Sequence, residues 1–261
     1  MRKLKIVVED ATLRNRVLFA LAALIVFRLL AAIPIPSIDA SGIAAFLANN
    51  QFFGLLNIFS GGGFSNLSIV MLGVGPYITA SIVMQLLTVL VPKLKEIYQE
   101  EGDAGRARFM QYSRYLTLPL AFLQGFAFLI LLQQNGAIPP LSLETTIINV
   151  FVIAAGSMLL MWLGELITEF GIGNGVSLII FAGIVAGIPA SIAQLFFSFD
   201  LSQLPTYIAM AAAAVAITAG VVFITEAERP IPVTYARRVR GMKVMGGVST
   251  YLPLRLNQSG V

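Results

Sequence analysis

Few side chains in this sequence could take part in acid–base, nucleophilic or metal chemistry. The 261 residues include no cysteine and no histidine, which removes thiol nucleophiles, imidazole bases and most transition-metal sites. Glu165 and Glu169 are spaced four apart at the end of an apolar run, and we interpret them as orientation and salt-bridge residues, not as a catalytic carboxylate pair. Arg28 lies inside another apolar run, where it could extend to the membrane surface or pair with a carbonyl. The sequence therefore predicts neither an enzyme nor a cofactor or metal site.

Three consecutive glycines, Gly61 to Gly63, could in principle form a loop that binds phosphate. A Walker-type loop ends in a lysine followed by Ser or Thr, and no lysine lies between Arg28 and Lys93. A flexible linker is the other simple interpretation, but Phe59 and Phe64 make this stretch more apolar than linkers usually are. The glycines are better explained by the element that surrounds them.

The composition is that of an integral membrane protein. Apolar residues make up 57% of the chain and charged residues only 11%, whereas charged residues form about a quarter of a soluble domain. A helix needs about 20 apolar residues to cross the hydrocarbon core. Six runs qualify, and they lie at 17–33, 69–91, 115–132, 147–167, 176–197 and 204–225.

The positions of lysine and arginine predict the orientation of these helices. Sixteen of the 17 basic residues fall into the segments 1–16, 92–114 and 226–261, and Arg28 is the exception. Short basic loops stay in the cytoplasm, so both the amino terminus and the basic segment 226–261 are expected on the cytoplasmic side. Losing or adding one crossing would scatter the charges over both faces, which supports six spans.

The external segment 34–68 contains an unusual uncharged stretch at 41–68, "SGIAAFLANNQFFGLLNIFSGGGFSNLS". Its apolar runs are too short to span a bilayer, and irregular backbone in contact with lipid would leave N–H and C=O groups unsatisfied at a cost of several kcal/mol each. We therefore expect a re-entrant element, with a glycine hinge, that is buried in the protein or lines a water-filled cavity.

Three motifs resemble the SecY family, the pore-forming subunit of the protein-conducting channel, and above all its bacterial members. They are "FSGGGFSNLSIVMLGVGPYITASIVMQLL", "MWLGELITEFGIGNGVSLIIFAGIVAGIP" and "YLPLRLNQSGV". The resemblance implies an all-α, polytopic membrane helix bundle with six transmembrane helices and a re-entrant plug helix. These would form the first half, plus one helix, of an inverted-repeat channel of ten helices. The basic segment 226–261 would then lead toward a seventh helix that this sequence does not contain.

The resemblance also assigns roles around the pore. It implies a plug made of Leu55, Asn57, Ile58, Phe59, Ser60, Gly61, Gly62, Gly63, Phe64 and Ser65, and a ring of apolar side chains made of Val74, Ile78, Val176 and Ile180. Each ring pair is spaced four apart, which places its members on one helical face, although ordinary helix packing has the same spacing. Branched aliphatic side chains suit a dewetted seal that bars ions.

Two further sets of residues follow from the resemblance. Thr79 and Gln85 would belong to a lateral gate, or else would only form hydrogen bonds between helices. A basic cluster of Arg237, Arg238, Arg240 and Lys243 would meet the ribosome or the SecA motor, or else would only be a solvated cytoplasmic face. The implied partners are small membrane subunits of the SecE and SecG type, SecA, the ribosome, secretory preproteins with signal sequences and the lipid bilayer.

The resemblance thus implies a passive channel subunit in the cell inner membrane, which passes unfolded secretory chains across the membrane and membrane segments into it. An inverted-repeat secondary transporter is the alternative of a different class. Ion-coupled transport usually requires a buried acidic residue near the middle of the membrane, and the sequence shows none there.

Overall fold

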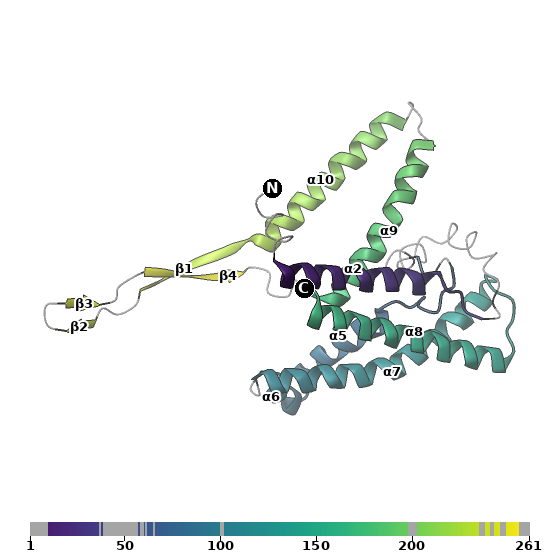
Figure 1. Ribbon diagram of the computed structural model, residues 1–261, viewed down its shortest axis with the longest axis horizontal. Coiled ribbons are helices and arrows are strands. Elements are labelled where there is room, and N and C mark those ends of the chain that lie inside the picture. The colour runs from purple at the N-terminus through teal and green to yellow at the C-terminus, as the bar shows by residue number, and fades with distance from the viewer. Residues whose placement is uncertain are drawn as a thin grey trace. The chain divides into compact units, whose positions relative to one another are not determined.

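The computed structural model describes residues 10–36, 38, 57, 60, 62–64, 66–99, 102–197, 203–234, 238–240, 243–245 and 249–255. The chain divides into two compact units, Met1–Ala193 and Gln194–Val261. Within the described ranges, five helices are long and apolar enough to cross a membrane, and a bent helix pair gives a sixth if it counts as one span. The prediction of a helical membrane protein is confirmed (Figure 1).

The first described element of the first unit is α2 (Ala11–Ala32), which is capped by Asp10. The Asp10 carboxylate accepts a hydrogen bond from the Thr12 N–H at 2.9 Å. The buried face of α2 consists of Ala20, Ala23, Phe27 and Ala31, at the spacing of one helical stripe. This stripe of mostly small side chains allows α2 to pack against α8 (Leu143–Phe170).

A compact series of turns, not a helix, occupies the start of the run expected to span the membrane at 69–91. Residues 66–74 form turns, and α5 (Gly75–Leu90) begins only at Gly75. The Ile35 N–H donates to the Leu67 carbonyl at 2.8 Å, and the Ile69 N–H donates to the Ile33 carbonyl at 3.0 Å. These bonds satisfy the backbone of the turns inside the protein, which is the condition for irregular backbone at membrane depth.

The segment expected as a cytoplasmic loop at 92–114 is also mostly helical. After Val91, α6 (Pro92–Gln99) turns away from α5 by 114°, since proline favours the first turn of a new helix. α7 (Gly102–Gln134) then returns through the bundle and packs against α5, α6 and α8. Tyr98 and Phe109 hold α6 on the first turns of α7, with ring centroids 4.8 Å apart.

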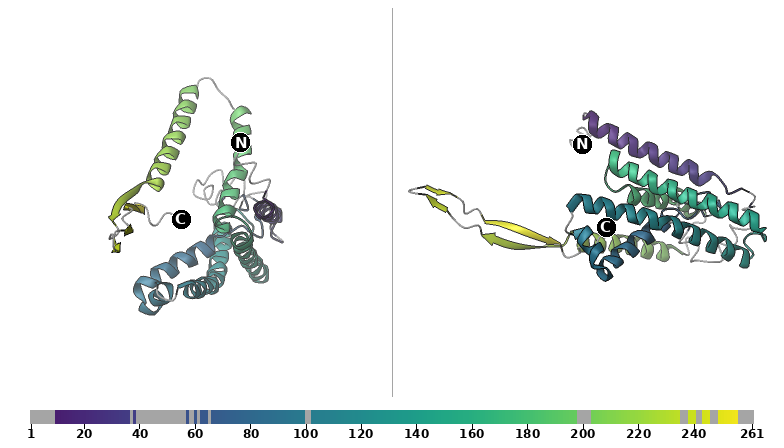
Figure 2. Two further views of the ribbon diagram at one scale, coloured as in Figure 1. Left: turned by 60° about the vertical axis from the view of Figure 1, so that its left-hand side comes forward. Right: turned by 90° about the horizontal axis from the view of Figure 1, so that it is seen from below.

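α8 is the central helix of the first unit and buries more residues than any other described helix there. Figure 2 shows it running alongside α7, and it also contacts α2 and α5. Gly156 lies so close to the turns before α5 that a Cβ atom there would overlap the Ile69 carbonyl oxygen. α9 (Gly175–Phe197) follows α8 after a four-residue connection.

The second unit contains α10 (Leu204–Glu226), an apolar helix that buries none of its residues in the described structure. The sequence predicts a loop throughout 226–261, but the described part contains two antiparallel strand pairs. β1 (Glu228–Thr234) pairs with β4 (Ser249–Arg255), and β2 (Arg238–Arg240) pairs with β3 (Lys243–Met245). The expectation of a chain without strands is therefore corrected in this segment.

The register of the β1–β4 ribbon is compatible with its prolines. Pro230 lies opposite Pro253, and Pro232 lies opposite Tyr251. Because proline has no N–H, these must be the pairs whose backbone groups point away from the partner strand. The ladder hydrogen bonds then fall to the intervening pairs, such as Ile231 with Leu252.

Candidate pore constriction and plug segment

Val74 lies at the junction between the turns and α5. Gly73, with φ of +58°, ends the turns in a conformation that residues with a Cβ rarely adopt. Val74 then caps α5, its carbonyl accepts the Ile78 N–H at 3.0 Å, and Pro76 occupies the first helical turn. Gly73 before Val74 and Pro76 after it thus determine where α5 begins. They place the buried Val74 at the first residue before the helix.

One apolar cluster brings together three of the four predicted ring residues. Val74 is 3% exposed within it, and Val176 and Ile180 from α9 pack against it partly buried. Side chains from α2 and α8 complete the cluster, among them Phe27 and Ile167. The fourth residue, Ile78, is 37% exposed and is not a member. The described structure therefore joins the two helix starts but leaves Ile78 outside their shared core.

The described plug residues form a tight turn. Asn57, Ser60, Gly62, Gly63 and Phe64 are described, whereas Leu55, Ile58, Phe59, Gly61 and Ser65 lie outside the described residues. The Ser60 hydroxyl donates to the Asn57 carbonyl at 3.1 Å and accepts the Phe64 N–H at 3.2 Å. Gly62 has a φ of +80°, so at this position glycine meets the demand of the turn itself.

Phe64 anchors this turn in a second apolar cluster. It is 1% exposed, and its ring meets the Phe128 ring of α7 edge-on, with centroids 5.5 Å apart. Leu67 and Met71 from the turns and Ile153 from α8 lie in the same cluster. The side chains of this segment are thus buried in protein. Irregular backbone at membrane depth requires such a place, away from lipid.

The two predicted gate residues differ in environment. Thr79 donates to the Gly75 carbonyl at 3.0 Å and lies 3.5 Å from the Gln124 side-chain nitrogen of α7, a long hydrogen bond. Gln85 is exposed, and its backbone carbonyl accepts a hydrogen bond from the Thr88 hydroxyl at 2.6 Å. Sequence reasoning missed Gln124, although a polar residue in the middle of the run 115–132 could have indicated it.

Two of the charged residues, Arg114 and Glu165, form an ion pair between helices. The Arg114 Nε of α7 lies 2.5 Å from a carboxylate oxygen of Glu165 on α8. This contact confirms the interpretation of Glu165 as a salt-bridge residue, while Glu169 is exposed. No group of three or more acidic side chains that could hold a metal ion occurs in the described ranges.

The basic cluster falls on the shorter strand pair. Arg238 and Arg240 belong to β2, and Arg240 is the register partner of Lys243 in β3. Arg237 lies outside the described residues. Backbone pairing therefore places three of the four residues of the predicted basic cluster within one short hairpin.

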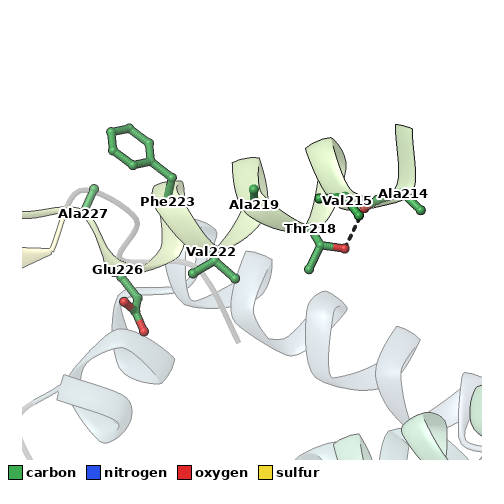
Figure 3. Close-up of a pocket in the computed structure, with 8 residues that line it drawn as sticks. All are labelled: Ala214, Val215, Thr218, Ala219, Val222, Phe223, Glu226 and Ala227. Carbon is green, nitrogen blue, oxygen red and sulfur yellow. Dashed lines mark hydrogen bonds between the residues drawn. The ribbon is translucent and has the colours of Figure 1, made fainter. Parts of the chain in front are cut away.

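A shallow, open groove of about 810 Å³ lies along α10 and is almost entirely apolar. Figure 3 shows the Thr218 hydroxyl on this side of the helix, donating to the Ala214 carbonyl of its own helix at 2.8 Å. Glu226 is the one ionisable residue of the lining, which consists of Ala214, Val215, Thr218, Ala219, Val222, Phe223, Glu226 and Ala227. Such a surface lacks the paired acid, base and nucleophile that catalysis requires.

Known proteins resemble the chain over most of its length. The sequence model of the SecY family matches residues 68–261. Protein translocase subunit SecY of Mycobacterium tuberculosis (strain ATCC 25618 / H37Rv) is 42% identical over 263 residues, which cover 95% of this chain and 59% of the relative. The subunit of the same name from Streptomyces scabiei is 41% identical over 267 residues, covering 95% and 60%. The chain thus spans about three fifths of the length of these relatives.

Solved structures share the fold at lower sequence identity. The chain covers 54% of one described as "The structure of a protein conducting channel", with 95% of its own residues, a TM-score of 0.63 and 23% identity. Sec61 in the canine ribosome-channel complex gives a TM-score of 0.61 at 23% identity, over 87% of this chain and 51% of that one. From the family match and the identity to its curated relatives, we conclude that the chain belongs to the SecY family.

Proposed function

We propose that the chain forms part of a protein-conducting channel in the cell inner membrane, where it passes unfolded secretory polypeptides across the membrane and membrane segments into it. The observation that carries this proposal is the apolar cluster in which Val74 from the start of α5 meets Val176 and Ile180 from the start of α9. Branched aliphatic side chains from two helix starts suit a seal that excludes water and offers a moving chain no charge.

The plug forms the second layer of this seal in our proposal. The support is the turn at Gly62 and Gly63 and the burial of Phe64 against α7. Opening would then require Phe64 to leave its cluster. We assign Leu55 to Ser65 to the plug as the sequence indicates, and we assign Ile78 to the side of the ring that faces the pore, since it is the exposed member.

Thr79, Gln85 and Gln124 are proposed to form the polar part of the lateral gate on α5 and α7. The contact between Thr79 and Gln124 supports this assignment, because a hydrogen-bonded seam separates at lower cost than a fully packed apolar one once water or a polar chain can replace the bond. The gate would admit signal sequences.

The basic hairpin of β2 and β3 is the proposed docking surface for a cytosolic partner. Its register partners Arg240 and Lys243 suit an acidic protein surface or RNA phosphates. The proposed partners are the ribosome, the SecA motor and, in the membrane, subunits of the SecE and SecG type. The distribution of Lys and Arg supports a cytoplasmic amino terminus and six spans, with α5 and α6 as one bent span.

The channel itself is proposed to be passive, so that a partner supplies the energy. An ion-coupled transporter would use an acidic side chain that is free to bind the ion. In the described helices Glu165 is instead paired with Arg114. The SecY family match leaves no observation in favour of a secondary transporter.

Asparagine substitutions on α9 test the seal. In the full-length channel subunit that carries this sequence, V176N and I180N should raise the resting ion conductance of planar bilayers, because asparagine lets water wet the constriction. I184N is the matched control, since Ile184 lies one helical turn further along α9 and is 39% exposed. Deletion of residues 55–65 should raise the conductance independently. Normal expression with resting conductance equal to that of the parent in V176N, I180N and the deletion variant would refute the proposal.

A further inference from the structure

The connection between α8 and α9 holds the two helices at unusually short range. α8 ends at Phe170 and is capped by Gly171, whose N–H donates to the Ile167 carbonyl at 2.8 Å, and Gly173 continues the chain with a φ of +69°. Two glycines face each other across this connection. A Cβ atom on Gly175 would overlap the Gly164 carbonyl oxygen, and one on Gly164 would lie 3.0 Å from a Val176 methyl carbon. The contact at Gly175 therefore requires glycine, while the contact at Gly164 is tight against Val176.

The Thr168 hydroxyl joins the same two helices by hydrogen bonds. It donates to the Gly164 carbonyl of α8 at 2.9 Å, as threonine often does within a helix. It also accepts the Gly175 N–H of α9 at 2.8 Å. The first N–H group of a helix has no partner within that helix, so Thr168 supplies from α8 what α9 lacks.

A local cap completes the start of α9. The Asn174 side-chain oxygen accepts the Ser177 N–H at 3.2 Å, and the Asn174 carbonyl accepts the Leu178 N–H at 3.0 Å. This cap satisfies α9 from its own chain, as asparagine commonly does at an N-cap. It does not tie α9 to any other helix. The bond to Thr168 does, one residue before Val176.

We propose that Thr168 is a positioning residue that sets where α9 begins against α8, and thereby holds Val176 against the Val74 cluster. Without its hydroxyl, the N–H of the buried Gly175 would lose its hydrogen-bond partner, and the close contact of Gly164 with Gly175 would lose its directional bond. The placement of α9 on α8 stands on the geometry alone. Its consequence for the seal rests on the proposed function.

A distance measurement between the two helices tests this placement. The chain has no cysteine, so two introduced cysteines can carry spin labels at unique positions. W162C on α8 and F181C on α9 suit this purpose, since Trp162 is 56% exposed and Phe181 is 60% exposed. The distance between the labels is then measured by pulsed electron paramagnetic resonance in the full chain, with and without changes at Thr168.

Removing the hydroxyl should displace α9. T168V keeps the branched shape of the side chain, and we expect it to shift or broaden the distance distribution by about 1–2 Å, the size of helix shifts at packed interfaces. T168A should do the same, and it guards against an effect of the valine itself. T168S restores the hydroxyl and should return the parent distribution. T146V is the matched control on α8, because Thr146 donates to the Ser142 carbonyl just before its own helix.

The outcomes separate the two claims. A distribution in T168V and T168A equal to that of the parent overturns the positioning role, whatever the channel does. A shifted distribution with an unchanged resting conductance upholds the positioning role and counts against the proposed seal. A shift that T168S fails to reverse also overturns the proposal, because the effect would not depend on the hydroxyl.

Discussion

At the scale of single residues, the most unusual feature of the first unit is a set of buried polar atoms. Among the described residues, the side-chain oxygens of Ser68 and Ser157 and both polar atoms of Asn149 are buried without a hydrogen-bond partner. Asn149 is 0% exposed on α8. A buried polar group without a partner costs about 1–3 kcal/mol, so Asn149 lowers the stability of the resting fold.

Asn149→Leu should therefore stabilise the protein. We expect the free energy of unfolding to rise by about 1–3 kcal/mol, because leucine has a similar size and needs no hydrogen-bond partner. The measurement is denaturant unfolding in detergent micelles. N135L is the control, since the exposed Asn135 already donates to the Leu131 carbonyl at 2.7 Å. A lower stability in N149L than in the parent would show that Asn149 has a partner the structure does not describe.

Asp10 should make the start of α2 sensitive to acid. The Thr12 hydroxyl and the Thr12 N–H both donate to its carboxylate and hold the pKa of Asp10 below its ordinary value. A lowered pKa in the folded state means that the cap stabilises α2 fully above the ordinary carboxyl pKa and is lost as the pH falls through the lowered value.

Amide exchange in the first turn of α2 measures this cap. After correction for the intrinsic pH dependence, protection should fall at acidic pH in the parent. In D10N it should be independent of pH over the same range, because asparagine also caps helices but does not titrate. Equal pH dependence in both proteins would assign the effect to another group.

At the scale of elements, the close approach of α8 to the turns before α5 determines how the first unit packs. A Cβ atom at Gly156 would overlap the Ile69 carbonyl oxygen. We expect G156A to lower the free energy of unfolding by about 1–3 kcal/mol, since backbone cannot move aside as a flexible side chain does.

G187A provides the comparison for this prediction. Gly187 lies in α9, and a Cβ atom there would have no neighbouring atom within 4 Å, so alanine should be neutral or stabilising by about 0.5–1 kcal/mol. Denaturant unfolding of both variants in the same detergent distinguishes a specific contact from a general effect of alanine. If G156A were as stable as G187A, the two elements would have to be further apart than described.

The membrane-spanning helices could be predicted from the sequence because about 20 consecutive apolar residues in a chain with so little charge indicate a helix that crosses the membrane. The start of α5 was not, because the turns at 66–74 are as apolar as the helix after them, and only tertiary hydrogen bonds to Ile33 and Ile35 distinguish the two. The strands were missed for a related reason. Proline has no N–H group for a ladder hydrogen bond, so Pro230 and Pro232 argue against a strand. Only the register shows that both lie at positions where β4 does not need a donor.

The apolar cluster at the proposed constriction was predictable to the extent that single helices define it. Spacing and resemblance selected Val74, Val176 and Ile180, which the structure brings to one cluster. Gln124 and Thr168 depend on partners across helices, and a single sequence does not show which faces of its helices meet. Their contacts could be recognised only once the helices were in place.

At the scale of the whole molecule, the asymmetry of charge predicts how the proposed cytosolic partners would bind. Replacing Arg237, Arg238, Arg240 and Lys243 together by glutamate should weaken binding of ribosomes and of the SecA motor by about tenfold or more, since it turns attraction into repulsion. Binding of the parent should also weaken as salt is added. Both are measured by co-sedimentation over a range of ionic strength.

A lysine variant separates charge from shape in this prediction. Changing the three arginines to lysine keeps the positive charge but removes the planar guanidinium groups. Binding retained in this variant and lost in the glutamate variant assigns the interaction to charge. Binding retained in both would leave the cluster with a role in membrane topology alone.

The prolines of β1 have a consequence for the behaviour of many copies at high density. A two-stranded ribbon has open edges, and an open edge can recruit a further strand from a neighbouring chain, which is the first step of amyloid-like growth. The outward positions 230 and 232 of β1 offer no N–H group, so a strand added there would leave its own carbonyls without donors. Ile231 of β1, which is 40% exposed, can therefore remain available for contact without making this edge of the ribbon a template for aggregation.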